Sequence, residues 1–376
     1  MSGGSVCQAC AGRAKLQGIK KPVAATELPL GAQDAGRRLD RILRRILPTV
    51  PLGRIHAAVR RGEIRVGGRR RAGSYRVAAG DTIEVTAELA TELAPSARPA
   101  AGLPRDLSDR VVYENEHLIA LDKPAGTPVD GPGGLLARVR PYLEAGEHAS
   151  VSFRAGPLHR LDRNTSGLIL FPRSLAGSQR VSELLRTGGL AKGYLAVLRG
   201  SLHAAERWDD ELTRDTDRGI TRAAGRQSTG TPAEADGRDT SEERRLGRAR
   251  STVVPLATSG AATLVLVSIE TGRTHQIRAQ AAAHGHPLLG DGKYGGADTG
   301  ASGSSGAATY LLRAAVIVNT DPDEIFPATD LCVPMTDAAR AVLPPELEES
   351  TVDRFCTCDH LISLMRGLIY KDPAAE

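Results

Sequence analysis

The sequence predicts an α+β protein: a large domain built on a long mixed, mainly antiparallel β-sheet flanked by helices, preceded by a small α/β module. Two observations lead to this prediction. Apolar runs of strand length are interspersed with stretches of helical spacing across residues 109–345. Between Arg37 and Arg76, thirteen arginines stand against two acids, which indicates a separate basic module before the larger domain.

The N-terminal part divides into a leader, the basic module and a linker. We expect residues 1–36 to form a flexible leader, since the start of the chain lacks the apolar core of a signal peptide. The module at 37–90 begins with two short helical stretches and continues with strands at 64–66 and 82–85. Residues 91–108 are rich in Ala and Pro and are expected to be a linker.

The large domain is predicted from its alternation of apolar runs. Strands are expected at 111–113, 118–121, 167–171, 194–198, 263–269 and 311–318. Helices are expected at 135–143, 174–185 and 274–284, the last with Thr274 as its N-cap. Residues 205–250 hold eleven acids and ten arginines with almost no apolar periodicity, so we expect a disordered or loosely ordered insertion. The tail at 346–376 contains an amphipathic helical stretch.

Composition excludes several classes of protein. No apolar run approaches the ~18–20 residues of a membrane span, so a cytoplasmic location without membrane contact is expected. The five cysteines are an odd number without a signal peptide, which favours reduced thiols. A zinc site could in principle combine Cys7 and Cys10 with Cys356, Cys358 and His360. A lone CxxC pair in a tail is a weak signal, and we predict no bound metal.

Three segments concentrate polar residues next to predicted strands. They are Leu121–Gly126, His159–Gly167 and Thr271–Arg278. Asp162 in isolation is more often a structural ion pair than a catalyst. His159 and Ser166 could suggest a hydrolase, but no G-x-S-x-G elbow is present, and no glycine-rich stretch fits a nucleotide-binding loop. Residue chemistry alone therefore predicts a site with an Asp, an Arg and a Tyr.

The second of these segments resembles the signature of the RluA-type pseudouridine synthases. Four further segments match later or earlier motifs of that family, in the family's order: Asp122–Gly126, Lys192–Val197, Gly272–Arg278 and His286–Gly295. The resemblance covers about residues 110–335. The basic module is similar to the small RNA-binding domain of a small-subunit ribosomal protein, in the version carried by the RluC branch, with Gly67 where the hairpin usually has Asn.

The resemblance implies an isomerase that converts uridine to pseudouridine and needs no cofactor. Asp162 would be the nucleophile, attacking C1′ or C6 or assisting proton removal at C2′. Arg278 would be the partner that keeps Asp162 ionised, and Tyr194 would stack on the target base and serve in deprotonation at C5. Arg160 would fill the space left by the flipped base. Further RNA contacts are expected from His159, Lys123, Lys192, Arg273, Lys293, Arg54, Arg60, Arg61 and Arg65.

Two further functions stay open at this point. The chain could be a catalytically degenerate RNA-binding protein of ribosome assembly, against which the intact Asp162, Tyr194 and Arg278 argue. It could also carry the same activity on transfer RNA, although the RluC-like module favours large-subunit ribosomal RNA as the partner. We expect a monomer, and the role of the charged insertion is not readable from the sequence.

Overall fold

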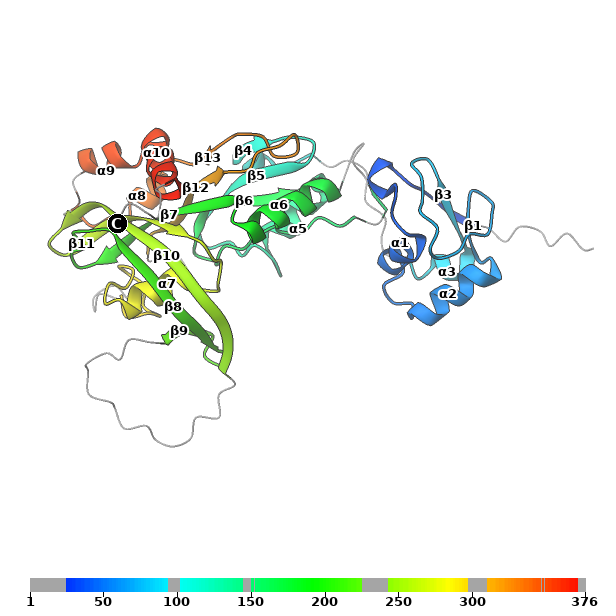
Figure 1. Ribbon diagram of the computed structural model, residues 1–376, viewed down its shortest axis with the longest axis horizontal. Coiled ribbons are helices and arrows are strands. Elements are labelled where there is room, and N and C mark those ends of the chain that lie inside the picture. The colour runs from blue at the N-terminus through cyan, green and yellow to red at the C-terminus, as the bar shows by residue number, and fades with distance from the viewer. Residues whose placement is uncertain are drawn as a thin grey trace, which may run out of the picture. The chain divides into compact units, whose positions relative to one another are not determined.

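The computed structural model describes residues 25–93, 102–144, 150–151, 153–224, 243–296, 310–345, 347 and 349–370. These residues belong to two compact units, the first made of residues up to Ser96 except Gly31–Gln33, the second of those three residues and the rest of the chain. Each unit has its own β-sheet, and the large sheet is the long band of strands in the second unit (Figure 1). None of the described helices is long and apolar enough to cross a bilayer.

The first unit packs helices against a three-stranded antiparallel sheet of order β1-β3-β2. Its elements are β1 (Ala25–Pro29), α1 (Leu39–Ile46), α2 (Leu52–Arg61), β2 (Ile64–Val66), β3 (Thr82–Thr86) and α3 (Ala87–Ala90). The expected hairpin turn is present, because Gly67 and Gly68 both adopt positive φ, at 57° and 73°. The prediction of a flexible leader up to residue 36 is wrong from Ala25 onward, since Leu28 of β1 pairs with Ile83 of β3. Residues 1–24 lie outside the described part.

The second unit is built on a ten-stranded sheet of order β4-β5-β6-β12-β7-β11-β10-β8-β9, with β13 paired to β12. All neighbouring pairs are antiparallel except β6 with β12, which confirms the predicted mixed, mainly antiparallel α+β fold. The strands are β4 (Val111–Glu114), β5 (Leu118–Lys123), β6 (Ser166–Pro172), β7 (Leu190–Arg199), β8 (Glu206–Asp215), β9 (Ile220–Ala224), β10 (Glu243–Ser259), β11 (Ala262–Ile269), β12 (Leu312–Asn319) and β13 (Leu331–Cys332).

Helices cover both faces of this sheet, which explains why its central strands are apolar almost without interruption. The helices are α4 (Arg105–Ser108), α5 (Leu135–Leu143), α6 (Leu175–Thr187), α7 (Gln276–Ala283), α8 (Asp337–Arg340), α9 (Glu349–Phe355) and α10 (Cys358–Ile369), besides a 3-10 turn η1 (Ala32–Asp34). Alternate residues of β7 point to opposite faces. Tyr194 and Ala196 pack in one cluster with α5 and α7, while Leu195 and Val197 pack with α8, α9 and α10.

The prediction of a disordered insertion at 205–250 is wrong for the residues of β8, β9 and the first half of β10. Three of its apolar residues, Trp208, Leu212 and Ala249, are fully buried. Its charges pair between strands, since the Arg248 guanidinium lies 2.6 Å from the Asp209 carboxylate. Sequence periodicity missed these strands because most of their exposed residues are acids and arginines, which give no apolar alternation. Residues 225–242 lie outside the described part.

Two smaller expectations also change. The stretch predicted as linker, 91–108, ends in α4, and its residues 94–101 are not described. Cys332 and Cys358 form a disulfide that joins β13 to α10, so the expectation of reduced thiols is wrong for this pair. Cys358 is therefore not free to serve in the zinc site weighed from the sequence, and the described residues contain no group of three His, Cys, Asp or Glu placed to hold a metal. Cys7 and Cys10 lie outside the described residues.

Candidate active site

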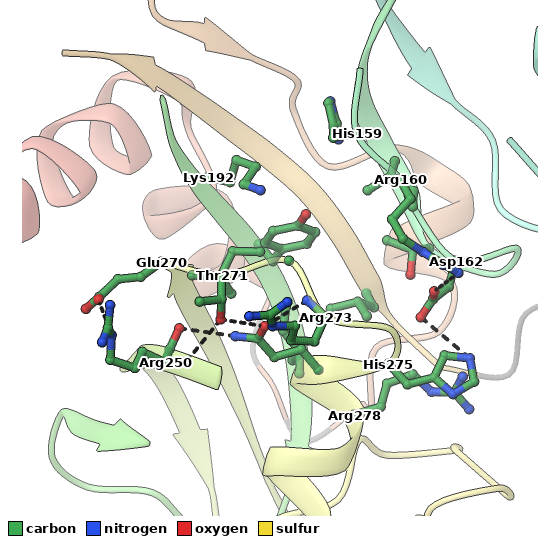
Figure 2. Close-up of a pocket in the computed structure, with 18 of the residues that line it drawn as sticks. His159, Arg160, Asp162, Lys192, Arg250, Glu270, Thr271, Arg273, His275 and Arg278 are labelled. Carbon is green, nitrogen blue, oxygen red and sulfur yellow. Dashed lines mark hydrogen bonds and ion pairs between the residues drawn. The ribbon is translucent and has the colours of Figure 1, made fainter. Parts of the chain in front are cut away.

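A cleft of about 500 Å³ opens on the face of the sheet that α7 covers, a volume typical of ligand sites. Two of the three polar segments predicted from sequence, His159–Gly167 and Thr271–Arg278, contribute residues to its lining, although more than 100 residues separate them along the chain. Figure 2 shows Asp162 and His275 at one end of the cleft, with Arg250 and Glu270 at the other and Arg273 between them. The charged residues in its lining are Arg160, Asp162, Arg186, Lys192, Arg250, Glu270, Arg273 and Arg278.

The loop that carries Asp162 is held by a buried lysine. Lys123, at the end of β5, is 0% exposed, and its Nζ donates to the carbonyl oxygens of Pro124, Thr127 and Arg163 at 2.9, 2.8 and 3.1 Å. The expectation that Lys123 contacts RNA is therefore wrong, because the buried ammonium already donates to three carbonyl oxygens and has no further N–H group for a phosphate. Burial lowers the pKa of Lys123 to about 8. Its contact with Arg163 ties the turn after β5 to the Asp162 loop.

The carboxylate of Asp162 lies in the cleft under two opposing influences. Burial raises its pKa, while Arg160, Arg278, Arg214 and Lys123 act in the opposite direction through their positive charges. Arg160 forms an ion pair with it at long range, with Nη2 3.6 Å from Oδ1, and His275 Nε2 lies 3.8 Å from Oδ2. The carboxylate is thus surrounded by positive charge without being locked by a close salt bridge.

Arg278 does not pair with Asp162 as the sequence led us to expect. Its guanidinium makes a bidentate pair with Asp291, at 2.7 and 2.8 Å, and lies between the rings of Tyr294 and Tyr310, 4.7 and 4.9 Å from their centroids. Both members of the ion pair are buried. Arg278 still lines the cleft and acts on Asp162 through its charge, but Asp291 fixes its position.

Tyr194 lies in β7 with its ring in the cleft and only 6% of the residue exposed. Burial raises the pKa of its phenol, and the negative charge of Asp162 raises it further. The hydroxyl is therefore protonated at neutral pH. Register places this ring beside Val267 of β11 and Ala314 of β12, so the centre of the sheet supports it.

His159 is engaged with the backbone. Its Nε2 accepts a hydrogen bond from the Leu170 amide at 3.1 Å, and burial lowers its pKa to about 3. Ser166, its expected partner in a hydrolase, lies 3.5 Å from Arg313 instead. His159 and Ser166 therefore do not form the nucleophile–base pair that a hydrolase would require.

The cations of the cleft outnumber its acids. Lys192 lines the cavity with a pKa lowered by burial, and no ion pair of it is found among the described side chains. Arg273 is exposed at the rim and reaches the Arg248 carbonyl at 3.4 Å, while Arg250 is paired with Glu270. An unneutralised positive lining suits a polyanion. In the first unit the predicted contacts Arg54, Arg60, Arg61 and Arg65 are all exposed.

Sequence reasoning missed several residues of this site. His275 stands within the third polar segment, yet no pattern there distinguished it from its neighbours. Tyr294 and Asp291 lie in the matching segment at 286–295, but nothing in their spacing indicated a contact with α7. Arg214 had no signal at all, since it lies on β8 inside the region expected to be disordered. Helix α7 also begins at Gln276, not after Thr274 as predicted, because His275 adopts a left-handed backbone.

Comparisons with known proteins agree with this site. Residues 117–283 match the model of the family described as RNA pseudouridylate synthase. "Ribosomal large subunit pseudouridine synthase C" of Salmonella typhimurium is 32% identical over 78% of this chain and 88% of its own length. The Escherichia coli K12 protein of the same name is 33% identical over 70% and 78%.

A solved human structure, "RNA Pseudouridylate Synthase Domain Containing 1", aligns with 68% of this chain and 94% of its own, at 21% identity and a TM-score of 0.48. The sequence relatives carry the assignment, because their identity holds along most of both chains. On that basis the chain belongs to the RNA pseudouridylate synthase family, of the RluA type that its motifs resemble.

Proposed function

We propose that this chain isomerises specific uridines of large-subunit ribosomal RNA to pseudouridine, with Asp162 as the nucleophile. The observation that carries the proposal is the Asp162 carboxylate, which lies in a positively lined cleft with no close salt bridge to occupy it. The names of the relatives support large-subunit ribosomal RNA as the substrate. Transfer RNA is the second candidate, and the experiment below separates the two.

The reaction requires a carboxylate and no cofactor. It breaks the N1–C1′ bond, turns the uracil and rejoins it through C5, with no net change in oxidation state. An ionised Asp162 can attack C1′ or C6 or assist proton removal at C2′. Burial raises the pKa of Asp162, and the cations around it favour the ionised form and counter part of that effect.

Tyr194 would support the target base in the cleft. A uracil flipped into the cleft can stack on its ring, which the centre of the sheet holds in place. The raised pKa of the phenol keeps it neutral in the free enzyme. We therefore assign it first to stacking, and deprotonation at C5 would require the charge around it to change once the substrate is bound.

Basic residues would hold the RNA around the extruded base. Arg160 leaves 59% of its side chain exposed beside Asp162, so it can reach into the space that the base vacates. Lys192 and Arg273 would contact the backbone near the target. Arg54, Arg60, Arg61 and Arg65 of the first unit would bind phosphates farther along. We also propose that the enzyme is cytoplasmic and acts as a monomer.

Replacement of Asp162 tests the assignment. Asp162→Asn keeps the shape of the side chain but removes the nucleophile, so pseudouridine formation should fall by about a thousandfold or more while RNA binding persists. Asp106→Asn is the control, since this carboxylate is exposed and pairs with Arg138.

The readout is the pseudouridine map of total RNA from cells with the wild-type chain, with Asp162→Asn or with none. Loss of large-subunit ribosomal sites supports the proposal, and loss of transfer RNA sites alone selects the second candidate. Unchanged activity of Asp162→Asn would refute the catalytic assignment.

A further inference from the structure

His275 has a backbone conformation that its residue type rarely adopts. Its φ is 54°, and it is the one residue other than glycine with a positive φ among those the structure describes. The neighbouring Gln276 holds this turn: its Oε1 accepts hydrogen bonds from the Thr271 hydroxyl at 2.8 Å and from the Arg273 amide at 3.0 Å. Such strain persists only where surrounding structure enforces it, and it concentrates at functional sites.

The enforced conformation aims the imidazole at Asp162. Figure 2 shows the His275 ring facing the Asp162 carboxylate across the end of the cleft, with Nε2 3.8 Å from Oδ2. The other ring nitrogen, Nδ1, lies 2.8 Å from the hydroxyl of Tyr294. The side chain thus lies between the carboxylate and the half-buried phenol of Tyr294.

The tautomer of His275 follows from its second partner. The Thr221 amide donates to the Tyr294 hydroxyl oxygen at 2.9 Å, so the hydroxyl proton is free to point to His275 Nδ1. Nδ1 then accepts, and the ring proton resides on Nε2, facing Asp162. Thr221 itself is fixed, because its side-chain hydroxyl donates to the Thr274 carbonyl at 3.0 Å.

Burial, together with the surrounding positive charges, keeps this imidazole neutral. Burial lowers the pKa of His275 to about 3, and nearby cations contribute in the same direction. The groups that face His275 are Arg278, Arg214, Lys293, Arg160, Asp162 and Tyr294, and those that face Asp162 also include Lys123 and Tyr194. A neutral hydrogen-bond donor can orient the Asp162 carboxylate, which is already surrounded by positive charge.

We propose that His275 is a positioning residue for the reaction: its neutral Nε2–H donates to Asp162, with the tautomer set by Tyr294. This inference rests on the proposed function and assigns a role that the sequence had given to Arg278, whose guanidinium is held by Asp291. The 3.8 Å separation shortens to a hydrogen bond when the substrate fills the cleft, as distances in substrate-free sites commonly do.

Loss of this donor should change the pH dependence of the reaction. A donor to the ionised carboxylate lowers the pKa of Asp162, so its removal raises that pKa. Activity needs the ionised form, and it is lost as the pH falls through the pKa. Variants without the donor should therefore lose activity at a higher pH than the wild type. The acid limb of their pH–rate profile should be displaced upward by about one pH unit. Well above the limb their rates should approach the wild-type rate to within about tenfold.

The test compares single-turnover rates of pseudouridine formation against pH in the full chain. His275→Asn removes the imidazole but keeps a residue that tolerates positive φ. Tyr294→Phe keeps the ring over Arg278 and removes only the hydroxyl that sets the tautomer, so it should displace the limb in the same direction by less. Tyr142→Phe is the matched control, because it deletes a hydroxyl bonded to Glu114, which does not line the cleft.

The inference is overturned if His275→Asn and Tyr294→Phe keep the wild-type acid limb, or if both lose rate equally at every pH. Should His275→Asn fail to fold, Tyr294→Phe decides alone, since it leaves the packing of the ring unchanged. The proposed function is judged separately by the wild type and Asp162→Asn. A wild type that makes no pseudouridine refutes both, whereas an active wild type with unshifted variants refutes only the role of His275.

Discussion

At Asp162, burial and neighbouring charge act on one carboxylate in opposite directions. Burial alone would favour the protonated acid, which could not act as a nucleophile. The positive charges of Arg160, Arg278 and Arg214 counter it from separate elements, and none of the three forms a close salt bridge with the carboxylate. A close salt bridge would stabilise the ionised form more strongly, but it would also occupy the oxygens that must attack.

The pair of Arg278 and Asp291 is a buried structural contact that also places charge in the cleft. Arg278→Ala would leave the Asp291 carboxylate buried without its partner, so we expect the free energy of unfolding to fall by about 3–5 kcal/mol. Arg278→Lys should lose less, since it keeps the charge but not the bidentate geometry. Urea denaturation of Arg278→Ala, Arg278→Lys, Asp291→Asn and the Arg278→Ala/Asp291→Asn double variant measures this.

The double variant should be more stable than the sum of the two single changes predicts, because each single change leaves one buried charge unpaired. An Arg278→Ala protein as stable as the wild type would show that Arg278 has only an electrostatic role towards Asp162.

At the scale of elements, the parallel contact between β6 and β12 sets the position of the Asp162 loop. Gly167, near the start of β6, has a φ of 105° and pairs with Ala314 of β12. A Cβ at Gly167 would collide with the backbone of Ala314, its carbonyl oxygen above all. The glycine therefore permits the strand contact that fixes where the catalytic loop ends.

Gly167→Ala should be strongly destabilising for two reasons, the clash with β12 and the positive φ. We expect a loss of about 3 kcal/mol or more in the free energy of unfolding, and a lower rate because the Asp162 loop shifts. Gly156→Ala is the control, since a Cβ at that position would meet no atom within 4 Å and its φ is not positive. Equal thermal stability of the two variants would contradict the role of the close approach.

At the scale of the whole molecule, the chain consists of two units with separate cores. The second unit holds the complete cleft, while the first carries the concentrated arginines. Phosphate binding by such a module is independent of sequence and sensitive to salt. We expect the first unit to contribute affinity for RNA and the second to contribute the chemistry.

Arg60→Ala tests this division. Arg60 is exposed on α2, so the variant should lose one phosphate contact. The slope of the logarithm of the RNA association constant against the logarithm of the salt concentration should then become shallower by about 0.9. The single-turnover rate at saturating RNA should stay unchanged. Arg138→Ala serves as the control, because its guanidinium is neutralised by Asp106. A change in rate without a change in salt slope would place Arg60 outside the RNA-binding surface.

The sequence by itself determined the fold class, most strands and the loops that carry the chemistry. Apolar strands such as β7 and β11 can be predicted because both of their faces are buried, so their sequences are continuous apolar runs. The strands β8 and β10 were missed for the opposite reason. Their exposed charged residues pair between strands, and such pairs leave no apolar periodicity in a single stretch of chain.

The partners of the site residues were decided only by the tertiary structure. Motif order placed Asp162, Tyr194 and Arg278 in one site, and all three line the cleft. It could not show that Asp291 holds Arg278, that Lys123 is buried under the catalytic loop, or that His275 turns towards Asp162. These contacts depend on how separate elements approach one another, and the distance between two side chains is a property of packing that no local pattern contains.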